Sequence, residues 1–573
     1  MVSIEPMYPG QAGSPQTELA EQYVAGTSTT ITVADGTVLP DAPNIVTITN
    51  EDDTFVSVVY ATKTGNVLTD LSVIEGATTG TFTIAAKAAR LYTAADYDTV
   101  IGNIQTLATA SPVVIAASTG ANGTMSPIGD IQALKGDTRT FRITPNSGYV
   151  INDISVDGVS QGPIDTYTFT NIQNSHTISA TFKPATVYTV TINPPNETPS
   201  TSGVTLSASE GSVGTQAQRL AIVQTFAMHY LLPQNGWDNA IQLDETNLAK
   251  DINGNTVVVD GSAGDIMLGI DPFWWTITVL NATTSEVAIQ FSTAYHDNWY
   301  TAHLWDNQIS PRLYVGVFNG TVRTRNGATC LESGYNTSGI QNTITHDTIS
   351  QYAWNNGDQY NIVTHITWTA LQILALFVYG TLSFQDKVAQ GYSTGGSAAG
   401  SLHNNTANFS LTGGWTQGAA GSNTDCTILG IKNLYAHQWQ FMGGSIYNAG
   451  TAYIQYDQAD KMKISSGHAA AVTAGWKTIS IGLATTLSST YIKTTANDPY
   501  IPFFPKAGTG SSSTYYCDGA WSTQSDDRCC RVGGNCVDGA ACGLFALDVN
   551  HALSFSYWNV GARLQALAPP EAA

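Results

Sequence analysis

Apolar and polar residues alternate in short runs along the first part of the chain, with the period of two that half-buried β-strands show. Turn residues such as Asp35-Gly36 and Thr64-Gly65-Asn66 separate the runs. The runs predict strands at Thr29–Val33, Ile45–Thr49, Thr54–Tyr60 and Phe82–Ile84. A helix is expected from Ala94 to about Leu107, and it closes a first domain over residues 1–108.

A second domain is expected over residues 111–184, where the alternation is more regular. The run His176–Phe182 places every second residue on one face, as a strand with one buried side does. Asp157-Gly158 has the composition of a tight hairpin turn. Residues 185–214 begin with the β-like run Val187–Ile192 and are then rich in Pro, Ser, Thr and Gly, which predicts a linker.

The third domain, residues 215–568, is expected to contain helices as well as strands. A first helix is predicted at Gln216–Leu231 and a second at Ile362–Tyr379. In the second, the apolar positions 362, 366, 373 and 377 mark one helical face, and further apolar neighbours widen it. A helix that is apolar on most sides is buried, so we expect it to be the core element of an α+β domain. The chain as a whole is predicted to be a multidomain protein, mainly β with some α.

The run Gly533–Leu564 fits neither a strand nor a helix for long. Glycines and apolar residues such as Gly543-Leu544-Phe545 look like a frame, and side chains of mixed chemistry lie between them. A mixture of exposed aromatic and polar side chains is typical of a recognition surface. The alternative is an ordinary glycine-rich terminal hairpin. The candidate ligand-binding residues are Asn535, Val537, Asp538, Ala546, Asp548, Asn550, His551, Leu553, Phe555, Tyr557 and Trp558.

Composition narrows the classes of partner. Charged residues make up only 11% of the chain, and the formal net charge is −21, which argues against binding of nucleic acid through its phosphates. The first residues lack a basic region followed by an apolar stretch, so no secretory signal is expected. The most apolar run, Ala370–Gly380, is shorter than the roughly 20 residues that span a bilayer, and no membrane insertion is expected.

The usual catalytic motifs, GxSxG, HExxH and the P-loop, do not occur, and no catalytic residue, metal ligand or cofactor is predicted. His296 and His303 lie among tryptophans and tyrosines, which favours a polar loop over an aromatic patch rather than a metal site. Asp260, Asp265 and Asp271 leave calcium binding open, although their spacing is not that of an EF-hand.

Five of the seven cysteines lie close together in the sequence: Cys517, Cys529, Cys530, Cys536 and Cys542. An odd total excludes complete pairing within the chain. The spacings do not give the paired CxxC motifs of a zinc site. We therefore expect small buried thiols or one disulfide.

Short motifs in the first two domains resemble parts of known proteins. The first domain carries Tyr8-Pro9-Gly10, Ser14-Pro15, Leu39-Pro40-Asp41-Ala42-Pro43-Asn44, Glu75-Gly76 and Ala94-Ala95-Asp96-Tyr97-Asp98. These resemble the N-terminal adaptor domain of many phage tail fibres and baseplate proteins; a generic small β-sandwich is the alternative. The second domain, with Gly123-Thr124-Met125-Ser126-Pro127 and Gly148-Tyr149-Val150, resembles the β-repeat module of bacterial surface and phage proteins, which usually acts as a spacer.

The third domain resembles the C-type-lectin-like domain of phage tail proteins of the major-tropism-determinant kind. The resemblance covers roughly residues 240–565. It rests on Phe273-Trp274-Trp275, Leu313–Gly320, Leu429–Tyr435, Gly443-Gly444, Gly543-Leu544-Phe545 and Asn559–Leu564, in this order. Relatives often carry an aromatic residue after the Gly533-Gly534 pair, whereas this chain has Cys536 nearby, and Cys542 precedes Gly543. The extra cysteines weaken the case for a copy that is still being diversified.

The resemblance implies a tail-tip receptor-binding protein of a phage virion. Its N-terminal domain would bind tail or baseplate proteins, and its C-terminal lectin-like display face would bind a bacterial surface receptor, protein or glycan. It further implies a homotrimer, and a display segment, residues 533–564, of the kind that diversity-generating retroelements rewrite. Two alternatives remain open: a structural baseplate or decoration protein without receptor binding, and an enzyme like the formylglycine-generating oxidases, which share the broad fold.

Overall fold

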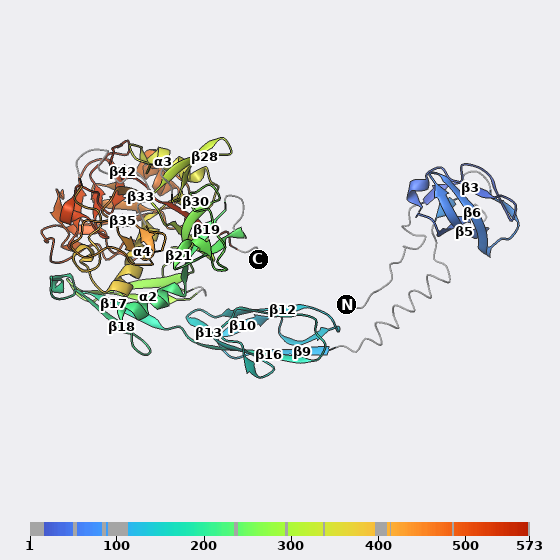
Figure 1. Ribbon diagram of the computed structural model, residues 1–573, viewed down its shortest axis with the longest axis horizontal. Coiled ribbons are helices and arrows are strands. Elements are labelled where there is room, and N and C mark those ends of the chain that lie inside the picture. The colour runs from blue at the N-terminus through green and yellow to red at the C-terminus, as the bar shows by residue number, and fades with distance from the viewer. Residues whose placement is uncertain are drawn as a thin grey trace. The chain divides into compact units, whose positions relative to one another are not determined.

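The computed structural model confirms a mainly β protein with a few helices. It describes residues 16–39, 41–49, 54–82, 87–89, 113–233, 239–292, 296–335, 339–395, 410–412, 414–483 and 486–570. The chain forms two compact units, residues 1–143 with 151–181 and residues 144–150 with 182–573 (Figure 1). The helix expected at Ala94–Leu107 lies outside the described residues.

The N-terminal sheet has the strand order β1 (Gln16–Glu18), β8 (Lys87–Ala89), β4 (Asn44–Thr49), β5 (Phe55–Thr64), β6 (Val67–Gly76) and β3 (Thr30–Thr32). A two-stranded ribbon of β2 (Tyr23–Ala25) and β7 (Gly80–Phe82) lies with it in the same hydrophobic cluster. β5 and β6 form a hairpin around Gly65, whose φ of 60° suits a residue without a Cβ. Val46, Val56, Val58 and Tyr60 are fully buried, which confirms the strands predicted at Ile45–Thr49 and Thr54–Tyr60. Of the strand predicted at Phe82–Ile84, only Phe82, the last residue of β7, lies within the described residues.

The module over residues 113–184 contains two sheets. One has the order β11 (Gly129–Ala133), β9 (Val113–Thr119), β16 (His176–Pro184), β13 (Tyr149–Val156) and β14 (Val159–Ser160); the other has the order β10 (Gly123–Ser126), β12 (Arg139–Pro145) and β15 (Thr166–Phe169). Asp157 and Gly158 both have positive φ and join β13 to β14 as a two-residue hairpin turn, as their sequence predicted.

Three sheets make up the frame of the C-terminal unit, and their strand bounds are as follows. The first has the order β18 (Val204–Ala208), β17 (Val187–Ile192), β24 (Ser285–Phe291) and β23 (Phe273–Val279). The second has the order β21 (Asn247–Asp251), β20 (Ile241–Asp244), β19 (Ala227–Leu232), β22 (Asp265–Ile270), β27 (Leu313–Gly316), β43 (Leu564–Leu567) and β30 (Tyr360–Ile362). The third has the order β35 (Lys477–Ser480), β34 (Thr451–Ile454), β33 (Trp439–Asn448), β40 (Asp527–Val532), β41 (Leu547–Val549), β39 (Gly519–Ser522) and β36 (Thr490–Tyr491), with β42 (Val560–Gly561) paired to β33.

Short ribbons and helices fill the space around these sheets. The ribbons pair β25 (Leu304–Trp305) with β26 (Gln308–Ile309), β28 (Thr321–Arg325) with β29 (Ala328–Glu332), β31 (Thr427–Ile428) with β32 (Ile431–Lys432) and β37 (Thr494–Thr495) with β38 (Pro505–Ala507). The α-helices are α2 (Gln216–Gln224), α3 (His346–Trp354), α4 (His365–Tyr379), α5 (Phe384–Lys387) and α6 (Gly467–Thr473).

Helix α4 is the core element of the C-terminal unit, as its apolar pattern predicted. All its residues are buried, Thr364 caps its N-terminus, and Gly380 ends it in the left-handed conformation. It begins three residues later than expected, because Ile362 is the last residue of β30. The helical stretch His365–Lys387 has the length and apolar character of a membrane span, and 94% of its most apolar window is buried inside the protein.

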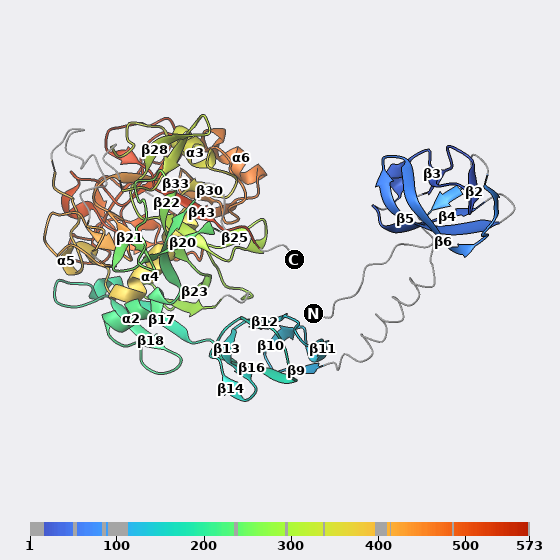
Figure 2. The ribbon, with the colours of Figure 1, turned by 45° about the vertical axis from the view of Figure 1, so that its right-hand side comes forward.

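Two expectations for the start of this unit are wrong. The helix expected at Gln216–Leu231 stops at Gln224, because the following residues form β19, which hydrogen-bonds to both β20 and β22. The linker expected over residues 185–214 contains β17 and β18, and every residue of β17 pairs with β24. In Figures 1 and 2, β17, β18 and α2 lie together at one end of the C-terminal unit. Val190 and Ile192 belong to its main hydrophobic core.

Candidate functional site

A pocket of about 390 Å³ opens above the third sheet of the C-terminal unit. Its floor is made of side chains from neighbouring strands. Arg531 of β40 lies directly opposite Asp548 of β41, and Asp548 lies beside Trp521 of β39. Residues paired across neighbouring strands share a face of the sheet, so these side chains point the same way. Trp439, the first residue of β33, completes the floor beside them.

Two loops of the predicted display segment form the walls. The first connects β40 to β41 and contributes Asn535, Val537 and Asp538; the second connects β41 to β42 and contributes Asn550, His551, Phe555, Tyr557 and Asn559. Glycine is required at the end of the first loop, because a Cβ on Gly543 would lie 2.1 Å from Asp518 Oδ1. The other carboxylate oxygen, Oδ2, accepts the backbone N–H of Phe545, which holds Asp518 in place. The frame residues thus fix the paths of both loops.

Arg531 is the central charge of the floor. Its Nη2 donates to Asp548 Oδ2 at 2.6 Å and to His551 Nδ1 at 2.5 Å. The guanidinium carbon lies 4.6 Å from the ring centroid of Phe555 and 5.4 Å from that of Trp439, both within cation–π range. Only 3% of the Arg531 side chain and 6% of the Asp548 side chain are exposed, so the ion pair is almost dry.

The two carboxyl groups of the pocket differ in their acidity. Burial by itself would raise the pKa of Asp548, but the charge of Arg531, the neighbouring His551 ring and a hydrogen bond from the Asn550 N–H outweigh it and hold the pKa below its ordinary value. For Asp538, burial dominates and raises the pKa to about 6. Its Oδ2 accepts from the backbone and side-chain amides of Asn535, at 3.1 and 2.5 Å.

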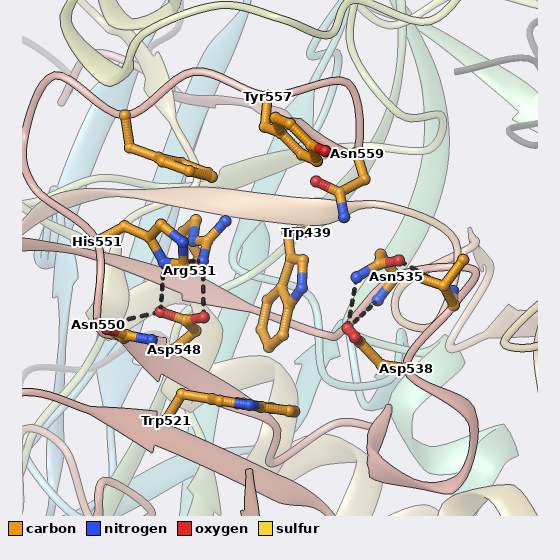
Figure 3. Close-up of a pocket in the computed structure, with 12 residues that line it drawn as sticks. Trp439, Trp521, Arg531, Asn535, Asp538, Asp548, Asn550, His551, Tyr557 and Asn559 are labelled. Carbon is orange, nitrogen blue, oxygen red and sulfur yellow. Dashed lines mark hydrogen bonds and ion pairs between the residues drawn. The ribbon is translucent and has the colours of Figure 1, made fainter. Parts of the chain in front are cut away.

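The aromatic side chains of the pocket lie at different heights. In Figure 3 the ring of Tyr557 lies at one side, that of Trp521 at the opposite side, and that of Trp439 between them. Trp439 and Trp521 meet edge to face, with ring centroids 5.4 Å apart and planes at 87°. Tyr557 is 52% exposed, so its ring stands at the solvent edge. The arrangement offers a small molecule apolar ring faces together with hydrogen-bonding groups.

The structure brings together eight of the eleven predicted site residues: Asn535, Val537, Asp538, Asp548, Asn550, His551, Phe555 and Tyr557. The prediction for Ala546 is wrong as a displayed position, because its side chain is fully buried in the hydrophobic core. Leu553 packs against that same core and, like Trp558, does not line the pocket. Trp558 contacts the ring of Tyr557, with centroids 6.1 Å apart.

Sequence reasoning missed four lining residues, Trp439, Trp521, Arg531 and Asn559. Three of them lie in strands outside the display segment, and no local pattern links them to it. One signal was available for Arg531: it follows Cys529 and Cys530 and precedes Val532 in a buried stretch of β40, where a charge requires a partner. Asn559 directly precedes β42 and was assigned to the frame motif at the end of the segment.

The cysteines are free, buried thiols. Burial raises the pKa of Cys517, Cys529 and Cys530 to about 12 and that of Cys536 to about 11. Because the thiolate is the reactive form, these groups are poor nucleophiles at neutral pH.

The residues considered for metal binding have other roles. Asp265 forms a buried ion pair with Arg325, and Asp271 pairs with Arg312. The buried ring of His303 bonds to the carbonyl of Ile270. Within the residues that the structure describes, no group of three or more His, Cys, Asp or Glu side chains is arranged to hold a metal ion.

The described start of the Gly391–Gly421 insertion touches the first wall of the pocket. The N–H of Gly539 donates to the carbonyl of Ser393 at 3.0 Å, and the N–H of Gly395 donates to the carbonyl of Cys536.

Comparison of the chain with models of protein families and with curated proteins gives no match. Inferences about function therefore rest on the geometry of this pocket and on the motifs of the sequence.

Proposed function

We propose that the C-terminal unit is the receptor-binding domain of a phage tail protein, and that the pocket above its third sheet contacts a bacterial surface receptor. The observation that carries this proposal is the pocket itself. Two loops of the predicted display segment form its walls, and a buried, hydrogen-bonded sheet face forms its floor. Recognition domains often present aromatic and polar loop residues on a rigid scaffold. Because the site is ordered before the ligand binds, binding does not have to offset the entropy cost of ordering it.

Binding fits this pocket better than catalysis does. Its carboxylates are engaged inside the protein, Asp548 by Arg531 and Asp538 by Asn535. Among the residues that line it there is no Ser, Thr, Cys or Lys to act as a nucleophile. The nearby thiols have raised pKa values, which also counts against chemistry like that of the formylglycine-generating oxidases.

The remaining parts of the proposal rest on the sequence resemblances. The N-terminal domain docks to tail or baseplate proteins, the module over residues 113–184 acts as a spacer, and the C-terminal unit has a lectin-like fold. The protein is a homotrimer in the virion, and its display segment belongs to the class that retroelements diversify. Several copies on one virion would raise a weak single-site affinity through avidity. Light scattering tests the trimer, with an expected mass three times the 60.7 kDa of one chain.

The test of receptor binding is adsorption of the labelled full-length chain to intact bacterial cells. The cells are those of the bacterium whose genome carries the gene, or of the host of the phage that carries it. Tyr557→Ala and Asn550→Ala change exposed wall residues and leave the sheet intact. We expect both variants to lose most of the adsorption while their unfolding curves match that of the wild type. Val472→Ala is the matched control, because Val472 is also 52% exposed and lies on α6 outside the pocket.

Adsorption that is unchanged in both wall variants would contradict the proposal. That outcome would favour the structural alternative, a baseplate or decoration protein without receptor binding.

A further inference from the structure

We propose that the pocket binds one neutral pyranose ring of a bacterial surface glycan, held without a metal ion. This inference rests on the proposed function and deepens it, because it names the chemical class of the ligand. Three properties of the pocket lead to it: the polar atoms that have no partner, the balance of charge, and the placement of the aromatic rings.

Two polar atoms at the pocket are buried and lack a hydrogen-bond partner among the described residues: Arg531 Nε and Asn559 Oδ1. The first is a donor and the second an acceptor. In Figure 3 the amide of Asn559 points into the pocket. A sugar hydroxyl both donates and accepts, so a ligand with several hydroxyl groups can satisfy both atoms. A phosphate or carboxylate would serve only the donor, and an ammonium group only the acceptor.

Arg531 is the one Arg or Lys among the residues that line the pocket, and its pairing with Asp548 selects against anionic ligands. Asp548 neutralises Arg531 across 2.6 Å, so no cation is left over to hold an anionic sugar. The aromatic faces that a cationic ligand would use are partly occupied already, since the guanidinium of Arg531 lies against Phe555 and Trp439. The chain also carries a formal net charge of −21, which repels acidic polysaccharides.

The aromatic rings suit the apolar face of a pyranose. The C–H groups on one side of a sugar ring carry a small positive charge and stack on the electron-rich face of an aromatic ring. Trp521 and Tyr557 lie at opposite sides of the pocket, with Trp439 between them (Figure 3). A volume of about 390 Å³ is near the lower end of the range for small-molecule sites, about 300–1,000 Å³, and leaves room for one pyranose ring.

Metal-bridged sugar binding requires several carboxylates that are free to coordinate the ion and the ligand together. Here Asp538 accepts from Asn535, and Asp548 is held by Arg531. We therefore assign recognition to direct hydrogen bonds and ring stacking, and binding is expected to persist when divalent cations are removed.

The experiment titrates the full-length chain with the methyl glycosides of glucose, galactose, mannose and N-acetylglucosamine, with and without EDTA, and follows heat or tryptophan fluorescence. At least one is expected to bind with a millimolar dissociation constant, the affinity that so few ligand atoms provide. EDTA should leave that affinity unchanged. Tyr557→Ala and Asn559→Ala should each weaken binding about tenfold or more, and Val472→Ala should not change it.

Several outcomes would overturn the inference. These are loss of binding in EDTA, an unchanged affinity in Tyr557→Ala, a preference for methyl N-acetylneuraminic acid, or no binding of any methyl glycoside or of purified surface polysaccharide from the cells. Periodate oxidation of the cells should abolish adsorption, and protease treatment should not. If adsorption depends on Tyr557 but survives periodate and is lost after protease, the receptor is a protein: the proposed function stands and the sugar inference fails. If adsorption depends on neither Tyr557 nor Asn550, both fail.

Discussion

The ion pair in the pocket floor allows a quantitative test of how the site is built. Arg531 and Asp548 are 3% and 6% exposed and lie 2.6 Å apart, so removing one partner leaves the other charge buried alone. Breaking such a pair costs about 3–5 kcal/mol, whereas replacing both partners by apolar residues of similar size is often close to neutral. Arg531→Met and Asp548→Val are therefore each expected to lower the free energy of unfolding by about 3–5 kcal/mol.

The double variant is expected to lose only about 1–2 kcal/mol. This residual loss arises because the Asn550 N–H, which bonds to Asp548 at 2.9 Å, loses its acceptor. The pair should thus show a coupling of several kcal/mol in a double-mutant cycle. Urea unfolding followed by tryptophan fluorescence is a suitable assay, because all 12 tryptophans lie beyond residue 236 and report only on the C-terminal unit.

Two results would refute this reasoning about the floor. The first is a loss of less than about 1 kcal/mol in each single variant, which would mean that water reaches the charges and screens them. The second is a double variant whose loss equals the sum of the single losses, since independent sites add. Sugar binding by the double variant serves as a separate readout, because both replacements remove the polar floor while keeping its shape.

Three further predictions concern single residues. The pKa of Asp538 is raised to about 6 in the folded state, so at this residue the unfolded chain binds fewer protons between about pH 4 and 6. This residue's contribution to stability should fall as pH rises through that window, and Asp538→Asn should remove that contribution from the pH dependence of the free energy of unfolding. Arg563 is fully buried and donates to four backbone carbonyls, those of Gly316, Val317, Lys432 and Asn433. Arg563→Lys leaves some of these carbonyls unpaired and should lower the free energy of unfolding by about 3–5 kcal/mol in the fluorescence assay. A decrease below about 1 kcal/mol would contradict this role of Arg563. Glu197 is fully buried and accepts hydrogen bonds from Gly203, Leu382, Thr381 and Lys387. Glu197→Gln should lower the free energy of unfolding by about 2–4 kcal/mol. An unchanged unfolding curve would show that the segment 185–214 is not tied to the core.

Local patterns in the sequence were enough to predict several elements. The alternation in the first 184 residues predicted strands such as β3, β4 and β5 but missed β6, because a strand with one buried side places apolar residues at every second position only where that side is uniformly covered. Asp157-Gly158 predicted its hairpin turn, since both residues tolerate positive φ. The apolar run of α4 predicted a buried helix, and the glycine-framed segment 533–564 predicted most of the pocket walls. Each of these depends on neighbours close in sequence.

Only the tertiary structure decided which distant residues meet. The run Ala227–Leu232 continues a helical pattern, yet it forms β19 because strands on both sides supply hydrogen bonds that a helix would not use. The run Val187–Ile192 reads as the start of a linker until β24, about 100 residues later, pairs with it. Arg531, Asp548 and Trp521 become one floor through a mixed antiparallel and parallel register that nothing in their local sequences specifies. The sequence by itself determined the elements whose pattern depends on near neighbours and most of the side chains displayed between them, whereas non-local strand pairing decided the remaining strands and where those side chains converge on a pocket.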